Sequence, residues 1–172
     1  MKKIENLMDG ELKRIYDEDQ KDRSEKLWEK DNQLMMARDT ARLKRILELV
    51  ERGQLKTPAD SLHAAMVLQH GTETKHYELA HELARNAADQ GYVAEKDEVD
   101  PLWLAAAAKD RSLMSQGKPQ LYGTQIKKDS KNGPWYLHPV DPSVTDEERA
   151  RFHVRTLAES WKRIEDLNKR EN

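Results

Sequence analysis

The feature of this sequence that most constrains its fold is a series of local start and stop signals for helices. Thr57-Pro58 and Asp100-Pro101 each place a capping side chain directly before a proline, which is the order found at the first turn of a helix. Gly53 and Gly117 follow apolar, charge-rich stretches, where glycine favours the left-handed residue that ends a helix. A chain punctuated in this way is expected to form several helices of ordinary length.

Apolar residues at helical spacing fill the stretches between these signals. Asp31 or Asn32 can cap the second helix, and Thr145 with Glu148 forms a capping box before the last one. The expected helices cover about residues 4–30, 32–52, 57–70, 72–90, 101–116 and 146–167.

Residues 120–140 have a different character, because apolar, aromatic and glutamine residues replace the charged helical pattern. Asn132-Gly133 is the dipeptide most typical of a two-residue hairpin turn. We expect either a short β-hairpin or an irregular extended insert here. The predicted fold class is therefore mainly α, a compact bundle of about six helices with this one insert, in a single α-rich domain over residues 1–172.

Composition supports an ordered chain and excludes several functional classes. Hydrophobic residues make up 37% and charged residues 36%, which fits helices with strongly charged outer faces, and four Trp and five Tyr argue against disorder. Thirty basic and 32 acidic residues are interspersed, so no basic stripe suggests nucleic acid as a partner. The absence of cysteine excludes disulfides and thiolate sites. No apolar run approaches ~18 residues and the start lacks a signal-peptide core, so we expect a cytoplasmic protein without membrane contact.

His70, directly after Gln69, is the first candidate for chemistry. It lies at the predicted end of an apolar helix, where imidazole can act as a general acid or base near neutral pH. The alternative is a structural histidine that donates to the last carbonyls of the helix or interacts with its dipole.

Asp19 and Arg23 stand four residues apart, as in an ordinary ion pair on a solvated helix face. Gln20 gives a functional alternative, because Gln20 and Arg23 could both point into a cleft.

Asp110-Arg111 precedes residues 117–125, a stretch crowded with hydrogen-bonding side chains. Arg111 could hold a carboxylate or phosphate in a bidentate fork, and Asp110 could orient His70. The glutamines and the tyrosine of the following stretch either line a binding site or clamp the insert structurally. These three residues are Gln120, Tyr122 and Gln125.

Four histidines raise the possibility of a metal site. His76 and His81 are five residues apart, which does not put two imidazoles on one helical face, and Gly71 interrupts the path from His70 to His81. No carboxylate completes a ligand pattern around these three or around His63. We therefore expect no metal and no other cofactor.

Taken together, the polar clusters resemble an uncharacterised bacterial domain family without an established reaction. The resemblance covers nearly the whole chain, and the pair Asp110-Arg111 followed by Gln-x-Tyr-Gly-Thr-Gln over residues 120–125 is its most specific part. The matching positions are Asp19-Gln20, Asp22-Arg23, Asp39-Thr40, Arg42-Leu43, Gln69-His70, Asp110-Arg111, Gly117, Gln120, residues 122–125, residues 139–142, Asp146 and Arg149. The resemblance implies that these clusters belong together. His63, His76 and His81 do not match it.

The leading hypothesis is a small-molecule-binding protein that acts without metal on a polar anionic or amide-bearing substrate. His70 would be the general acid/base and Asp110 would set its tautomer. Substrate would be held by Arg23, Gln20, Gln69, Arg111, Gln120, Tyr122 and Gln125. The alternatives are a non-catalytic binding or interaction protein with a structural polar network, and a homodimer that associates through the face around Trp161.

Overall fold

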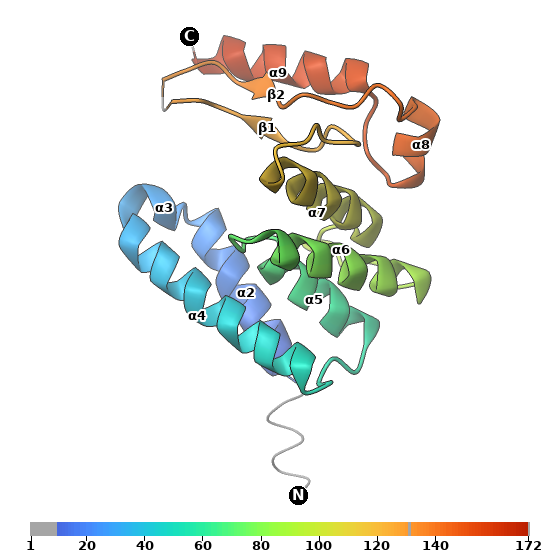
Figure 1. The fold of residues 1–172 in the computed structure, drawn as a ribbon. Coiled ribbons are helices and arrows are strands. Elements are labelled where there is room, and N and C mark those ends of the chain that lie inside the picture. The colour runs from blue at the N-terminus through green and yellow to red at the C-terminus, as the bar shows by residue number, and fades with distance from the viewer. Residues whose placement is uncertain (1–9, 131, 172) are drawn as a thin grey trace, which may run out of the picture.

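The computed structural model describes residues 10–130 and 132–171 of the chain (Figure 1). Eight helices and one two-stranded antiparallel hairpin lie within these ranges, which confirms the predicted mainly α fold. The elements are α2 (Glu11–Ser24), α3 (Leu27–Lys30), α4 (Asn32–Glu51), α5 (Pro58–Leu68), α6 (Thr74–Asp89), α7 (Pro101–Ser115), β1 (Ile126–Lys127), β2 (Tyr136–Leu137), α8 (Asp146–Arg151) and α9 (Leu157–Glu171).

The predicted capping residues begin the helices as expected. The side chains of Asp31, Thr57 and Asp100 each accept a hydrogen bond from a backbone N–H in the first turn of α4, α5 and α7. The carboxylate of Asp60 in turn accepts a hydrogen bond from the backbone N–H of Thr57, which completes a capping box. Thr145 accepts from the N–H of Glu148 at the start of α8. These boundaries are fixed by contacts within a few residues, which is why a local pattern predicts them.

Two of the expected helices are interrupted. The first one ends at Ser24, because Lys26 adopts a left-handed backbone conformation (φ 53°) before the single turn of α3. Its expected first residues, 4–9, lie outside the described part of the chain. The last one divides into α8 and α9 around His153, which is also left-handed (φ 54°). Neither break involves glycine, so the usual sequence signal for a left-handed residue is missing.

The insert contains a hairpin, but its connection is longer than a two-residue turn. Ile126 pairs with Leu137 and Lys127 with Tyr136, so residues 128–135 join the two strands. The predicted turn at Asn132-Gly133 was therefore wrong as a two-residue connection. Residues 120–125, which precede β1, form a loop whose only bridge in the described chain is between Gln120 and Val140.

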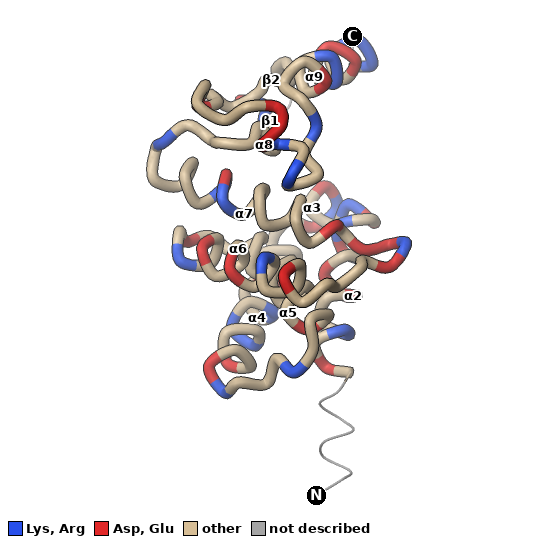
Figure 2. Tube along the Cα trace, turned by 90° about the vertical axis from the view of Figure 1, so that its right-hand side faces the viewer, with Lys and Arg blue, Asp and Glu red and all other residues tan. Residues whose placement is uncertain are grey.

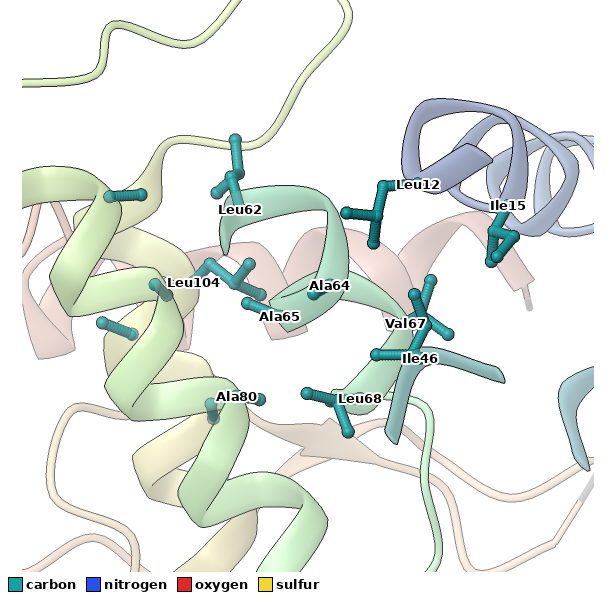
Figure 3. Close-up of a cluster of buried hydrophobic side chains, with 14 of the residues drawn as sticks. Leu12, Ile15, Ile46, Leu62, Ala64, Ala65, Val67, Leu68, Ala80 and Leu104 are labelled. Carbon is teal, nitrogen blue, oxygen red and sulfur yellow. The ribbon is translucent and has the colours of Figure 1, made fainter. Parts of the chain in front are cut away.

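Helix α7 lies between the α2–α6 layer and the hairpin with α8 and α9 (Figure 1). The main hydrophobic cluster joins α2, α4, α5, α6 and one side of α7, and alanines on α6 allow close packing against α5 and α7 (Figure 3). A second cluster forms around Ala106 of α7, with Tyr122, Val144 and Val154. Because α7 is covered on both sides, it places the neighbours Asp110 and Arg111 into different surroundings.

None of the helices in the described ranges is long and apolar enough to cross a membrane. Acidic and basic residues are interspersed over the helices (Figure 2).

Candidate functional site

The predicted site residues fall into two polar networks, one on each side of α7. The first joins α2 and α4 to His70 and Arg111. The second fixes residues 120–125 against Asp110. Gln125 connects the two, because its side chain contacts Arg111 while its backbone belongs to the second network.

His70 pairs with Asp19. The Nδ1 atom of His70 lies 3.1 Å from a carboxylate oxygen of Asp19, which is buried with 1% of its surface exposed. The expected pairing of His70 with Asp110 was wrong, because the carboxylate of Asp110 points at the loop of the second network. It was likewise wrong to expect Asp19 on a solvated face.

The electrostatics of the Asp19–His70 pair favour an ionised carboxylate and a neutral ring. Burial alone would raise the pKa of Asp19, but the hydrogen bond from His70 and the charges of Arg23 and Arg42 lower it. Burial lowers the pKa of His70, and the charges of Arg23 and Arg111 act in the same direction. An ionised carboxylate only accepts, so Nδ1 carries the proton. The Nε2 atom then presents its lone pair, and it makes no hydrogen bond to any described residue.

Ion pairs between α2 and α4 surround Asp19. Arg23 contacts Asp19 at 3.1 Å and forms a two-pronged pair with Asp39. Arg42, which is buried, donates to Asp39 at 2.8 Å and to Asp22 at 2.7 Å. Every guanidinium in this part of the network therefore has a carboxylate partner, as buried charges require.

Arg111 differs from these arginines. Its Nη1 donates to the backbone carbonyl of Gln69 at 2.8 Å, and its Nε donates to the side chain of Gln125 at 3.1 Å. It forms no ion pair within 4.0 Å of any acidic side chain in the described ranges. Burial lowers the pKa of Arg111, and the charge of Arg23 has the same effect. Arg111 is thus a largely covered cation that has only neutral hydrogen-bond partners.

Asp110 holds the loop of the second network by accepting four hydrogen bonds. One carboxylate oxygen accepts from the N–H groups of Leu121 and Tyr122, and the other accepts from the N–H and hydroxyl of Thr124, at 2.7 to 3.0 Å. Burial raises the pKa of Asp110, and these donors act in the opposite direction. With all its acceptor directions used, Asp110 has no capacity left for a substrate.

Gln120 is fully buried and also bonds backbone groups of the loop. Its Nε2 donates to the carbonyls of Gln125 and His138, while its Oε1 accepts from the N–H of Gln125. Tyr122 packs its ring against Phe152 with centroids 4.6 Å apart. These contacts make the second network a structural clamp, and neither Gln120 nor Tyr122 contacts His70.

The remaining predicted residues lie close to the Asp19–His70 pair. Gln20 donates to Asp19 at 2.9 Å. Gln69 is buried, and its side-chain oxygen has no hydrogen-bond partner within the described residues. The structure thus brings together Gln20, Arg23, Gln69, His70, Arg111 and Gln125.

Sequence analysis did not predict the pairing of Asp19 with His70 or the position of Tyr77 beside Arg111. Asp19 was considered as an ion-pair partner and as part of the resemblance, but not as the partner of His70, because nothing in a local pattern links it to a histidine 51 residues later. Tyr77 was not considered. Its hydroxyl donates to the carbonyl of Gly71 at 2.6 Å, and the side chain lies near Arg111.

The histidines considered for metal binding each have a separate partner. His63 contacts Glu98, His76 accepts from the N–H of Glu73, and the ring of His81 bonds the carbonyl of Ala105. In residues 10–130 and 132–171, no three His, Asp or Glu side chains are arranged to hold a metal ion.

In comparisons with known proteins, no family model, curated protein or solved structure matched this chain. The resemblance carried by the motif residues therefore stays a prediction.

Proposed function

We propose that this protein binds a small anionic molecule beside His70 and acts on it by general acid/base chemistry. The observation that carries the proposal is the covered guanidinium of Arg111, which lies next to His70 and has no carboxylate partner among the described residues. A buried charge is unfavourable unless it is paired, so an anionic ligand would supply what the chain does not.

His70 would serve as the proton-transfer group. Ionised Asp19 keeps the proton on Nδ1 and leaves Nε2 as a base, the same division of roles that an acidic residue imposes on histidine in hydrolytic enzymes. The lowered pKa of His70 keeps the ring neutral and ready to accept a proton near pH 7. Asp19 thereby takes the orienting role that sequence analysis assigned to Asp110.

Substrate selection would come from the groups around this base. Arg111 would hold the anionic end, since a guanidinium suits a carboxylate or phosphate. Gln69 has an unpartnered, buried side-chain oxygen, which would accept from an amide or hydroxyl of the ligand. The proposal thus covers a polar anionic or amide-bearing substrate in a cytoplasmic protein, and it requires no metal in the proton-transfer step.

A non-catalytic protein with a structural polar network is the second candidate. The hydrogen bonds of Asp110 and Gln120 support it, because these two predicted site residues, with Tyr122, hold residues 120–125 in place. The first candidate assigns ligand binding to Arg111 and proton transfer to His70, and the second assigns neither. Variants of these two residues therefore distinguish the candidates.

The first test is a thermal-shift screen of carboxylates and phosphate esters, with wild type, Arg111→Met and Arg52→Gln compared. An anion at ten times its Kd stabilises the native state by about 1.4 kcal/mol. We expect that stabilisation in wild type and in the exposed control Arg52→Gln, and its loss in Arg111→Met. Equal stabilisation of Arg111→Met would contradict the proposed ligand site.

The second test addresses catalysis with whichever ligand the screen identifies. His70→Gln should bind that ligand but turn it over about 10²–10⁴ times more slowly, the usual effect of losing a general base. Asp19→Asn should also slow turnover, because a neutral amide no longer fixes the proton on Nδ1. Unchanged turnover in His70→Gln would leave binding as the function and remove the catalytic role.

A further inference from the structure

A separate hollow lies between the first turns of α9, Trp103 of α7 and Gly123, Thr124 and Ile126. Its volume is about 170 Å³. Trp103, Thr124, Val154, Arg155, Ser160 and Arg163 line it. None of these residues contacts the Asp19–His70 pair, so the hollow is independent of the site proposed above.

Ser160 is the first sign of a missing partner. Only 4% of its surface is exposed, and its hydroxyl has no hydrogen-bond partner among the described residues. Burying a hydroxyl without a partner is unfavourable, so native structures rarely leave one unsatisfied. Thr124 lines the same hollow, but its hydroxyl already donates to Asp110 and accepts from Gln125. A ligand would therefore use Ser160 and leave Thr124 in place.

The charged residues that line the hollow are both arginines. Arg155 and Arg163 line it, no acidic side chain does, and neither arginine forms an ion pair within 4.0 Å in the ranges that the structure describes. Arg149, by contrast, pairs with Asp146 and donates to the backbone carbonyls of Val144 and Tyr122. Hydrogen bonds from Thr156, and after them the charge of Arg155, lower the pKa of the nearby Glu159. No ion pair among the described residues holds either arginine of the hollow, so both are available to an anion together with the Ser160 hydroxyl.

Most of the remaining lining is apolar. Trp103, Ile126 and Val154 contribute aromatic and aliphatic surface, and Gly123 adds backbone without a side chain. Small-molecule sites commonly combine such a surface with a few fixed polar groups. Arg155 and Arg163 also border a larger, open hollow of about 530 Å³ along α9. Glu159 and Asp166 line that hollow too, so an anion is favoured in the smaller hollow and not in the larger one.

We propose that this hollow is a binding site for a small organic anion, a carboxylate or phosphate monoester with a compact aromatic or aliphatic body. The anionic end meets Arg155, Arg163 and the Ser160 hydroxyl, and the body rests on Trp103 and Val154. The site does not depend on His70 or Arg111, because it uses none of their contacts.

The test is a titration of ¹⁵N-labelled protein with benzoate and, separately, phenyl phosphate, up to about 20 mM, within the millimolar range that weak sites require. Saturable shifts are expected at the amides of Gly123, Thr124 and Ser160 and at the indole N–H of Trp103. The two probes share a ring and differ in the anion, so their relative affinity identifies the preferred headgroup. Uncharged benzyl alcohol should give much smaller shifts.

Variants make the test specific. Arg155→Gln and Arg163→Gln change exposed side chains and should fold normally, yet each should raise the Kd about tenfold, as expected for a lost charge-assisted hydrogen bond. Ser160→Ala should weaken binding as well, whereas Arg52→Gln and His70→Gln should bind like wild type. Absence of saturable shifts with both anions, equal shifts with benzyl alcohol, or wild-type affinity in both arginine variants would overturn the proposal.

Discussion

The two polar networks beside α7 differ in what their carboxylates bind. Asp110 accepts almost entirely from backbone N–H groups of residues 121–124. Asp19 instead faces side chains, namely His70, Arg23 and Gln20. The first arrangement fixes the path of the chain, while the second arranges groups that titrate and carry charge.

This difference separates a structural role from a functional one more reliably than residue type does. Asp, Gln and Arg occur in both networks, yet only the network around His70 leaves polar atoms without protein partners. These are the Nε2 of His70, the side-chain oxygen of Gln69 and the Nε of Arg42. Arg111 nearby lacks a counter-charge in the described chain. A network whose polar atoms all have protein partners holds the fold, whereas a network with unpartnered polar atoms can still bind a ligand.

The largest expected effect is the loss of stability on substitution of Asp110. Asp110→Asn would turn an amide NH₂ toward N–H donors of the loop and leave at least one of them unpaired. We expect a loss of about 3 kcal/mol in the free energy of unfolding, measured by urea denaturation. The exposed Asp89→Asn should change it by less than about 0.5 kcal/mol. A similarly small effect at Asp110 would show that the loop does not depend on the clamp.

Gln120→Glu tests the same network with a smaller change. The carboxylate keeps the acceptor for the N–H of Gln125 but loses the donor to two carbonyls. A loss of about 2 kcal/mol at pH 7 is expected from the carbonyls left facing negative charge. Protonation of the new carboxyl restores a donor, so the deficit relative to wild type should shrink at low pH. Gln33→Glu, on the exposed start of α4, is the matched control.

Much of the fold could be predicted because helix starts depend on neighbours in sequence. Asp31, Thr57 and Asp100 cap from within three residues, so their pattern is visible locally. The breaks at Lys26 and His153 were missed because a left-handed residue other than glycine is imposed by packing and carries no local signal.

The site was predictable as a set of residues but not as a set of pairs. His70 and Arg111 were identified because titratable and charged groups stand out next to helix ends. Their partners depend on tertiary packing, which brought Asp19 to His70 and gave Asp110 to the loop. Adjacent residues on α7 point to different networks, and a sequence pattern cannot say which network each one joins.

The smallest predicted effect is a change in stability with pH that depends on His70. The pKa of His70 is lowered in the folded protein, so the unfolded chain takes up a proton first as pH falls. The stability that depends on neutral His70 is present above about pH 6.5 and is lost as pH falls from there toward the folded pKa. Wild type should therefore lose more stability than His70→Gln between about pH 7 and 5.5, measured by urea denaturation. Parallel curves would mean that His70 does not titrate differently in the fold. His76, whose pKa is also lowered, is common to both proteins and cancels.

The position of α7 has a consequence for how the molecule unfolds. Leu104 and Ala108 belong to the main hydrophobic cluster, while Ala106 belongs to the second. Opening either cluster would expose apolar surface of the same helix, so the two halves should lose structure cooperatively. Amide hydrogen exchange would register this as one slowly exchanging segment in the middle of α7, with protection decreasing in both directions along the chain.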